Sequence, residues 1–129
     1  LRKVMPPPTP AELNNPNFEE MARSKGRVLY TYVAENSKIF RVLLQSGPAA
    51  LAPIKELAQA ETERYFADLP SAEIPFGLVA NHMITSTFSF IKWWLDNDMS
   101  YTPEQMGDFS AQLIMLPIRR LLIGDNRGG

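Results

Sequence analysis

The stretch Trp93-Trp94-Leu95-Asp96-Asn97-Asp98-Met99-Ser100-Tyr101-Thr102-Pro103-Glu104-Gln105-Met106 joins two long apolar segments of the chain. An apolar run ends in the tryptophan pair, and the residues that follow are polar. Downstream, Thr102 can cap a helix, and Pro103 suits its first turn because the missing N–H is not needed there. Gln105 stands three residues after Thr102, where the partner in a capping box is expected. The stretch therefore predicts a helix, a short turn and a second, antiparallel helix.

Apolar residues recur at helical spacing in five segments, which cover about residues 18–35, 37–45, 48–69, 75–97 and 103–123. Asn17 and Ser37 are candidate caps for the first two segments, and Gly47-Pro48 should end the second. None of the segments has the strict alternation of a strand. We therefore expect an all-α fold of about five helices in residues 17–129, preceded by a Pro-rich linker or strap in residues 1–16.

Three residues disturb the helical pattern. Pro53 leaves the start of the third helix open, since a helix that began at Pro48 would lose a backbone hydrogen bond there. Pro117 lies inside the fifth segment, where it should free the carbonyl of Leu113 and kink the helix axis. Gly26 interrupts the first segment, at a cost of about 1 kcal/mol relative to alanine. These positions mark where a regular helix is least favoured.

The last two segments are apolar on more than one face, and such helices are normally buried on every side. At about 1.5 Å of rise per residue, the fourth helix would be about 35 Å long, too long for a small core to cover completely. We therefore expect both helices to pair with a second copy of the chain in a homodimer. The predicted seam residues are Phe88, Ile91, Trp94, Leu95, Phe109, Leu113, Leu116 and Leu121.

This pair of segments resembles the C-terminal domain of TetR-type transcriptional regulators. The resemblance is most specific in the apolar helix that ends in Trp93-Trp94-Leu95, in the turn Asn97-Asp98-Met99-Ser100, and in Tyr101-Thr102-Pro103-Glu104-Gln105-Met106, which opens the final helix. It extends more diffusely over roughly residues 18–123. It implies a dimer in which the last two helices of each copy form a four-helix bundle.

The resemblance also implies a mechanism and a set of partners. A small effector would enter a pocket between the helices and change their packing, and this would alter the spacing of two DNA-binding heads. Operator DNA would be read only through an N-terminal helix-turn-helix domain, which has no counterpart in this chain. The chain itself would then be the effector-binding and dimerisation domain.

Composition narrows the possible partners. The 129 residues include 13 basic and 14 acidic side chains, a net charge of −1, so no basic excess is present to hold a phosphate backbone. The absence of cysteine excludes disulfides and thiolate chemistry. We see no signal peptide, and the most apolar stretch, residues 76–91, is too short to span a bilayer. A cytoplasmic protein without a membrane partner is expected.

Bulky side chains beside a few polar groups suggest a mostly apolar pocket. Met83, Thr87 and Phe90 share one helical stripe by their spacing, and His82 is a candidate polar contact for a bound molecule. The other interpretation of His82 is a polar residue in or beside an interface. The predicted pocket residues are Tyr30, Phe40, Leu44, Leu57, His82, Met83, Thr87 and Phe90.

Catalytic signals are missing from the sequence. His82 is the only histidine and has no nucleophile or orienting acid at a suitable spacing. No cluster has metal-ligand spacing, and the glycines form no phosphate-binding loop. We therefore expect no cofactor, no metal and no enzymatic activity. The alternative function is a stand-alone helical dimerisation module whose core is filled and which binds no ligand.

Overall fold

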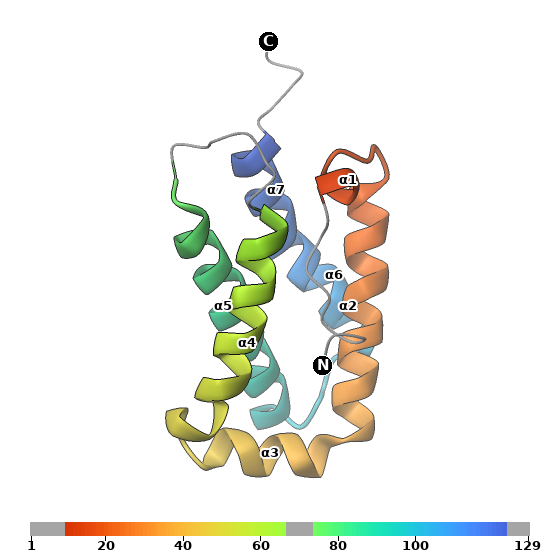
Figure 1. Ribbon diagram of the computed structural model, residues 1–129. Helices are drawn as coiled ribbons and strands as arrows, with labels where there is room; N and C mark the ends of the chain where they lie inside the picture. The colour runs from red at the N-terminus through yellow and green to blue at the C-terminus, as the bar shows by residue number, and fades with distance from the viewer. Residues whose placement is uncertain (1–9, 67–73, 124–129) are drawn as a thin grey trace.

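The computed structural model describes residues 10–66 and 74–123, which form an all-α fold (Figure 1). A short α1 (Pro10–Leu13) precedes α2 (Phe18–Glu35), α3 (Ser37–Gln45), α4 (Pro48–Phe66) and α5 (Phe76–Asp96). The last helix is continuous but has three parts: α6 (Pro103–Ser110), the π-helical turn η1 (Ala111–Met115) and α7 (Leu116–Ile123). The predicted all-α class with about five helices is confirmed.

The helices are arranged around the two long elements identified in the sequence. In Figure 1, α3 crosses the base of the molecule between α2 and α4. On one side α4 lies along α5, and on the other α2 lies along α6. Residues 67–69, which we expected at the end of the third helix, lie outside the described residues, as do residues 1–9 and 124–129.

The turn between α5 and α6 is fixed by local hydrogen bonds. Asp98 and Met99 adopt positive φ angles of 57° and 52°, and the N–H of Met99 donates to the carbonyl of Trp94 at 2.9 Å. The predicted capping box is present: Gln105 N donates to Thr102 Oγ1 at 3.0 Å, and Thr102 N donates to Gln105 Oε1 at 2.9 Å. The α5–α6 hairpin therefore follows from signals within the turn itself.

Other predicted helix ends differ in detail. The side chain of Asn17 makes no capping bond to α2, and its own backbone N–H donates to Asn15 Oδ1 at 2.8 Å. Asn36 occupies the N-cap position of α3, so Ser37 is the first helical residue instead of the cap. α3 ends before Gly47, as predicted, and Gly47 has a φ of +95°, which glycine adopts without strain. α4 begins at Pro48 with Pro53 inside it, which settles the open start.

Two glycines allow α2 and α6 to touch backbone to backbone. A Cβ atom on Gly26 would stand only 2.7 Å from the Cα of Gly107. On one side of this crossing, Arg23 Nε donates to Asp108 Oδ1 at 2.7 Å, and farther along, the hydroxyls of Tyr30 and Ser110 lie 2.8 Å apart. Glycine has a low helix propensity, but at position 26 the lack of a side chain permits this close approach.

The sequence predicted that Pro117 disturbs the last helix, and the structure has a π turn, η1, just before this residue. The N–H of Leu116 donates to the carbonyl of Ala111, five residues back. In a regular α-helix the ring of Pro117 would press against the carbonyl of Leu113 and leave it without its usual donor. A π turn is wider and moves that carbonyl relative to the ring, so η1 accommodates the proline within a continuous helix.

The described part of the predicted strap packs on the helical domain. The side chain of Leu13 is fully buried, and Arg119 Nε donates to its carbonyl at 2.8 Å. Glu12 forms an ion pair with Lys25 of α2 at 2.7 Å. Leu13 therefore contributes to the core. None of the helices in the described ranges combines the length and the hydropathy needed to cross a membrane.

Candidate functional site

The residues predicted for a dimer seam occupy two kinds of environment. Those on α5 are buried within one chain, each at most 4% exposed: Phe88, Ile91, Trp94 and Leu95. They pack on α2, α3, α4 and α6, so they offer no surface to a second copy in this conformation. Those on the last helix reach the surface fully or in part: Phe109, Leu113, Leu116 and Leu121. The residues of α5 that we predicted for the seam are therefore those that face the core of the single chain.

Exposed apolar side chains lie on the other side of α5 and along the last helix. Leu78 and Trp93 on α5 are 59% and 49% exposed, and Leu113 and Leu121 are 65% and 55% exposed. His82, Thr85 and Ser89 are exposed between the first two, at helical spacing. We call this surface the outer face, and its residues are Leu78, His82, Thr85, Ser89, Trp93, Phe109, Leu113, Leu116, Pro117 and Leu121.

Aromatic contacts join the two parts of the outer face. The ring of Trp93 stacks on Tyr101, with centroids 6.0 Å apart and planes inclined by 26°. Tyr101 in turn meets Phe109 edge to face, at a centroid distance of 5.2 Å. The apolar surface therefore continues from α5 across the turn to α6.

The eight predicted pocket residues do not converge on one place. Two are exposed, namely Leu57 and His82. Four contribute to a second core cluster around Trp94 or pack against it: Tyr30, Phe40, Leu44 and Phe90. Thr87 is half-buried and donates its hydroxyl to the carbonyl of Met83 at 2.8 Å. Met83 belongs to a different cluster. Met83 and Phe90 face the interior of the fold, as their shared helical stripe predicted, and the pocket itself stays a prediction.

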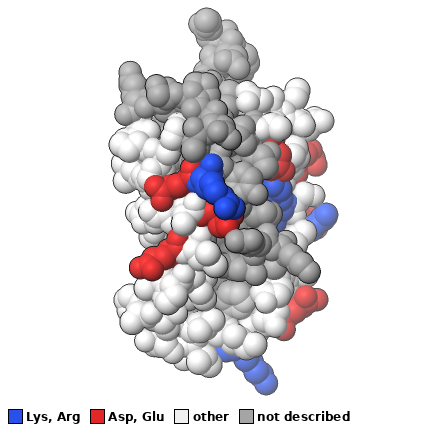
Figure 2. Space-filling view, in the orientation of Figure 1, with Lys and Arg blue, Asp and Glu red and all other residues white. Residues whose placement is uncertain are grey.

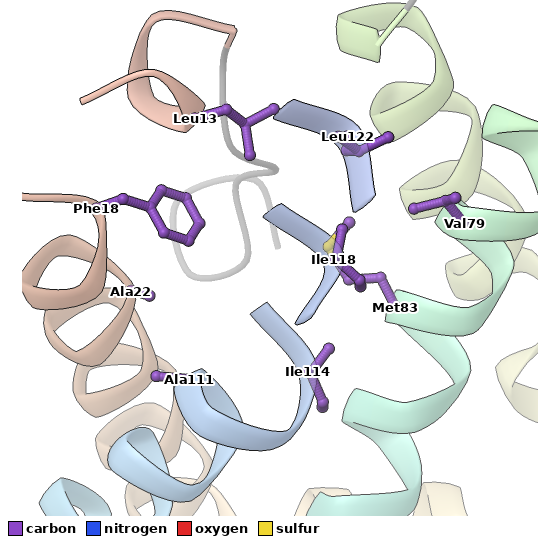
Figure 3. Packing of buried hydrophobic residues seen from close by; sticks show 9 residues of the cluster. All are labelled: Leu13, Phe18, Ala22, Val79, Met83, Ala111, Ile114, Ile118 and Leu122. Carbon is purple, nitrogen blue, oxygen red and sulfur yellow. The ribbon is translucent and has the colours of Figure 1, made fainter. Parts of the chain in front are cut away.

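Met83 lies in what we call the first core cluster, which draws on α1, α2, α5, η1 and α7. Its buried members are Leu13, Phe18, Ala22, Val79, Met83, Ala111, Ile114, Ile118 and Leu122. In Figure 3 the side chains from α1 and α2 face those from α5, η1 and α7. None of these side chains carries a charged or hydrogen-bonding group, so the cluster offers a purely apolar environment.

The sequence of this chain matches a family of known regulators. The family described as the C-terminal region of transcriptional regulators, of the TetR type, matches residues 27–116. The chain belongs to this family. Comparisons with curated proteins and with solved structures gave no match. The family places the chain with transcriptional regulators, as the resemblance around the α5–α6 turn implied.

A polar hollow of about 590 Å³ lies on the TetR-type domain between α2 and the start of α6. It is lined by Glu20, Arg23, Ser24, Arg27, Glu104, Gln105 and Asp108. The guanidinium of Arg23 is held by two carboxylates, Asp108 at 2.7 Å and Glu19 at 2.9 Å. Ion pairs within the chain already satisfy Arg23, so the hollow resembles a solvated helix crossing more than a site for an apolar effector.

Charged residues of both signs lie together on the surface of this TetR-type domain. On the face seen in Figure 2, lysine and arginine side chains are few, and a central group of them adjoins acidic side chains. In the described ranges, no group of three or more His, Cys, Asp or Glu residues could hold a metal ion. His82 is exposed on the outer face with its Nδ1 3.3 Å from Ser86 Oγ. An exposed position is compatible with the interpretation of His82 as a polar residue in or beside an interface, which stays a prediction.

Proposed function

We propose that this chain is the effector-binding and dimerisation domain of a TetR-type transcriptional regulator. It forms a homodimer through the outer face and holds a mostly apolar small molecule at the first core cluster. The observation that carries the proposal is the exposure of Leu113 and Leu121 on the same helix that contributes Ile114 and Ile118 to that cluster. One helix thus connects the two functions.

The outer face has the character of a subunit interface. Large apolar side chains gather there on two helices, joined by the contacts of Trp93, Tyr101 and Phe109. Continuous apolar patches of this kind are uncommon on monomers and mark interaction sites. A second copy that covered the patch would need to bury at least about 1,200 Å² in total. Polar His82, Thr85 and Ser89 would lie within the seam or at its rim.

Dimerisation is tested by placing a charge on the outer face. Leu113→Asp should give a monomer, because an unpaired carboxylate would be buried at the seam. Leu57→Asp is the matched control, since Leu57 is similarly exposed on α4, away from the outer face. Sedimentation velocity at micromolar concentration should find dimers for the wild type and Leu57→Asp. A monomeric wild type would refute the proposal.

The first core cluster supports effector binding by its composition and its position. Its side chains come from five elements and are all apolar, which suits a mostly apolar ligand. Met83, a member of the cluster, can adapt to ligands of different shape. A molecule held there would contact the last helix from the inside and would change the population of its packing states. The effector then acts on the dimer without touching the seam.

Operator DNA remains a partner of the regulator through another part of the protein. With 13 basic and 14 acidic residues, this chain lacks the positive excess that holds phosphates. The mixed signs of charge in Figure 2 agree with this. We assign sequence-specific DNA contacts to a helix-turn-helix domain, as in the resemblance, and signalling to the residues described above.

A further inference from the structure

The π turn η1 has one side in the core and the other on the surface. Its inner residues, Ala111 and Ile114, belong to the first core cluster and are almost completely buried. Its outer residue, Leu113, is the most exposed of the large apolar side chains on the outer face. Pro117 follows directly and cannot donate a backbone hydrogen bond. Any displacement at the inner residues is therefore transmitted to Leu113 through very few bonds.

The π turn also determines whether the outer-face residues of the last helix align along its axis. In an α-helix, residues four apart drift by about 40° per step, so Phe109 and Leu121 would diverge by about 120°. A π turn takes more residues per turn, so each of its residues advances by a smaller angle. It therefore brings Phe109, Leu113, Pro117 and Leu121 toward one straight stripe. All four are half-buried or exposed, as this alignment requires.

We infer that η1 is the switch that couples the first core cluster to the dimer seam. Repacking of the cluster displaces Ala111 and Ile114 and shifts the turn between π and α hydrogen bonding. Leu113 then rotates out of the stripe, while Pro117 biases the resting state toward the π form. The inference rests on the proposed dimer, because the stripe acts only when a second copy packs against it.

Deletion of Gln112 tests the role of the π turn in the seam. A π turn within an α-helix holds one surplus residue, so the deletion lets the helix become regular and keeps α7 facing as before. Only Leu113 leaves the stripe, and the dissociation constant of the dimer should rise about tenfold. Gln112→Ala is the matched control: Gln112 is exposed, and the variant loses the same hydrogen bond to Asp108 but keeps the turn. Its dimer should dissociate as the wild type does.

The coupling itself is tested by repacking the cluster far from the seam. Phe18 lies on α2 within the cluster, and Phe18→Leu should change the dissociation constant of the dimer by about threefold or more. In the variant that lacks Gln112, Phe18→Leu should have no such effect, because the turn that transmits the change is gone. Equal effects in both backgrounds, or no effect in either, would overturn the inference.

Two further variants distinguish failure of the switch from unfolding of the deletion variant and from failure of the proposed dimer. If circular dichroism finds that the deletion variant is unfolded, Pro117→Ala replaces it, since an alanine restores the donor and favours the regular helix. It should also weaken the dimer, because a regular helix of unchanged length turns Leu121 about 120° away from Phe109 and breaks the stripe, and an unchanged dimer would refute the switch. If Leu113→Asp leaves the dimer intact, the proposed dimer itself is wrong. If Leu113→Asp gives monomers but the deletion dimerises like Gln112→Ala, only the switch is wrong.

Discussion

Tyr30 places a hydroxyl within the buried contact between α2 and the last helix. Its ring meets Trp94 edge to face at a centroid distance of 5.4 Å, and its hydroxyl lies 2.8 Å from Ser110 Oγ. Burial raises the pKa of Tyr30 to about 12, and the hydrogen bond with Ser110 opposes this only in part. The neutral phenol fits the site, whereas a phenolate would lose its hydration.

This shift predicts how stability changes in alkali. The folded pKa of about 12 exceeds the ordinary value of 10.0, so the contribution of Tyr30 is complete below pH 10 and is lost as the pH rises toward 12. The free energy of unfolding should fall by up to roughly 1.4 kcal/mol per pH unit from this group. Tyr30→Phe should show a shallower fall in urea unfolding between pH 9 and about 11.5. Tyr32→Phe, which removes an exposed phenol, should keep the wild-type slope.

At the scale of elements, the crossing of α2 and α6 depends on the absence of two side chains. The backbones of Gly26 and Gly107 meet where any Cβ atom would collide with the opposite helix. The contact aligns the ion pair of Arg23 with Asp108 and the hydroxyl pair of Tyr30 with Ser110. The glycines lower helix propensity at the crossing, and the close approach that they allow brings the longer side chains of α2 and α6 into contact.

Gly26→Ala should consequently be destabilising, although alanine is the better helix former. Its Cβ would lie 2.7 Å from backbone atoms that cannot move without separating the helices, and we expect a loss of about 2 kcal/mol in the free energy of unfolding. Gly77→Ala is the control, because its Cβ would meet only the end of the Glu63 side chain at 3.0 Å. Chemical denaturation at one fixed chain concentration compares the two, and similar stabilities would contradict the argument.

At the scale of the whole molecule, the last helix has one buried side and one exposed side. Its inner side completes the first core cluster with Ala111, Ile114 and Ile118, and its outer side presents Leu113 and Leu121. A ligand in the cluster and a second copy on the outer face would therefore contact the same helix from opposite sides. Binding at either place should stabilise the fold as a whole.

An apolar dye provides a test that does not require the natural effector. N-phenyl-1-naphthylamine should bind saturably at the first core cluster and raise the melting temperature, with a gain of about 2.7 kcal/mol at 100 times its dissociation constant. Ala22→Leu should fill the cluster and abolish the shift, whereas Ala34→Leu, beside the second core cluster, should preserve it. Absence of binding to the wild type would favour a plain dimerisation module.

The helices and the α5–α6 turn could be predicted because their signals are local. Apolar spacing gave the segments, and Thr102 and Gln105 cap α6 through atoms only three residues apart. The inward side of α5 could not be predicted, since Ile91 and Trp93 are both apolar and only the packing of α2 and α4 distinguishes them. The predicted pocket residues lie in different places for the same reason. The rotation of each helix about its own axis is set by packing against other helices, and local sequence does not determine it.

The tryptophan pair has a spectroscopic consequence. Trp94 is sealed in the core, with its indole N–H donating to the carbonyl of Tyr101 at 2.8 Å, while the neighbouring Trp93 lies half open on the outer face. These are the only two tryptophans of the chain. In a single copy, emission therefore combines one shielded and one water-exposed fluorophore, and an aqueous quencher such as iodide reaches only the second, whereas pairing through the outer face should shield both. Association or dissociation of two copies could therefore be followed in the unlabelled protein by the fluorescence of Trp93.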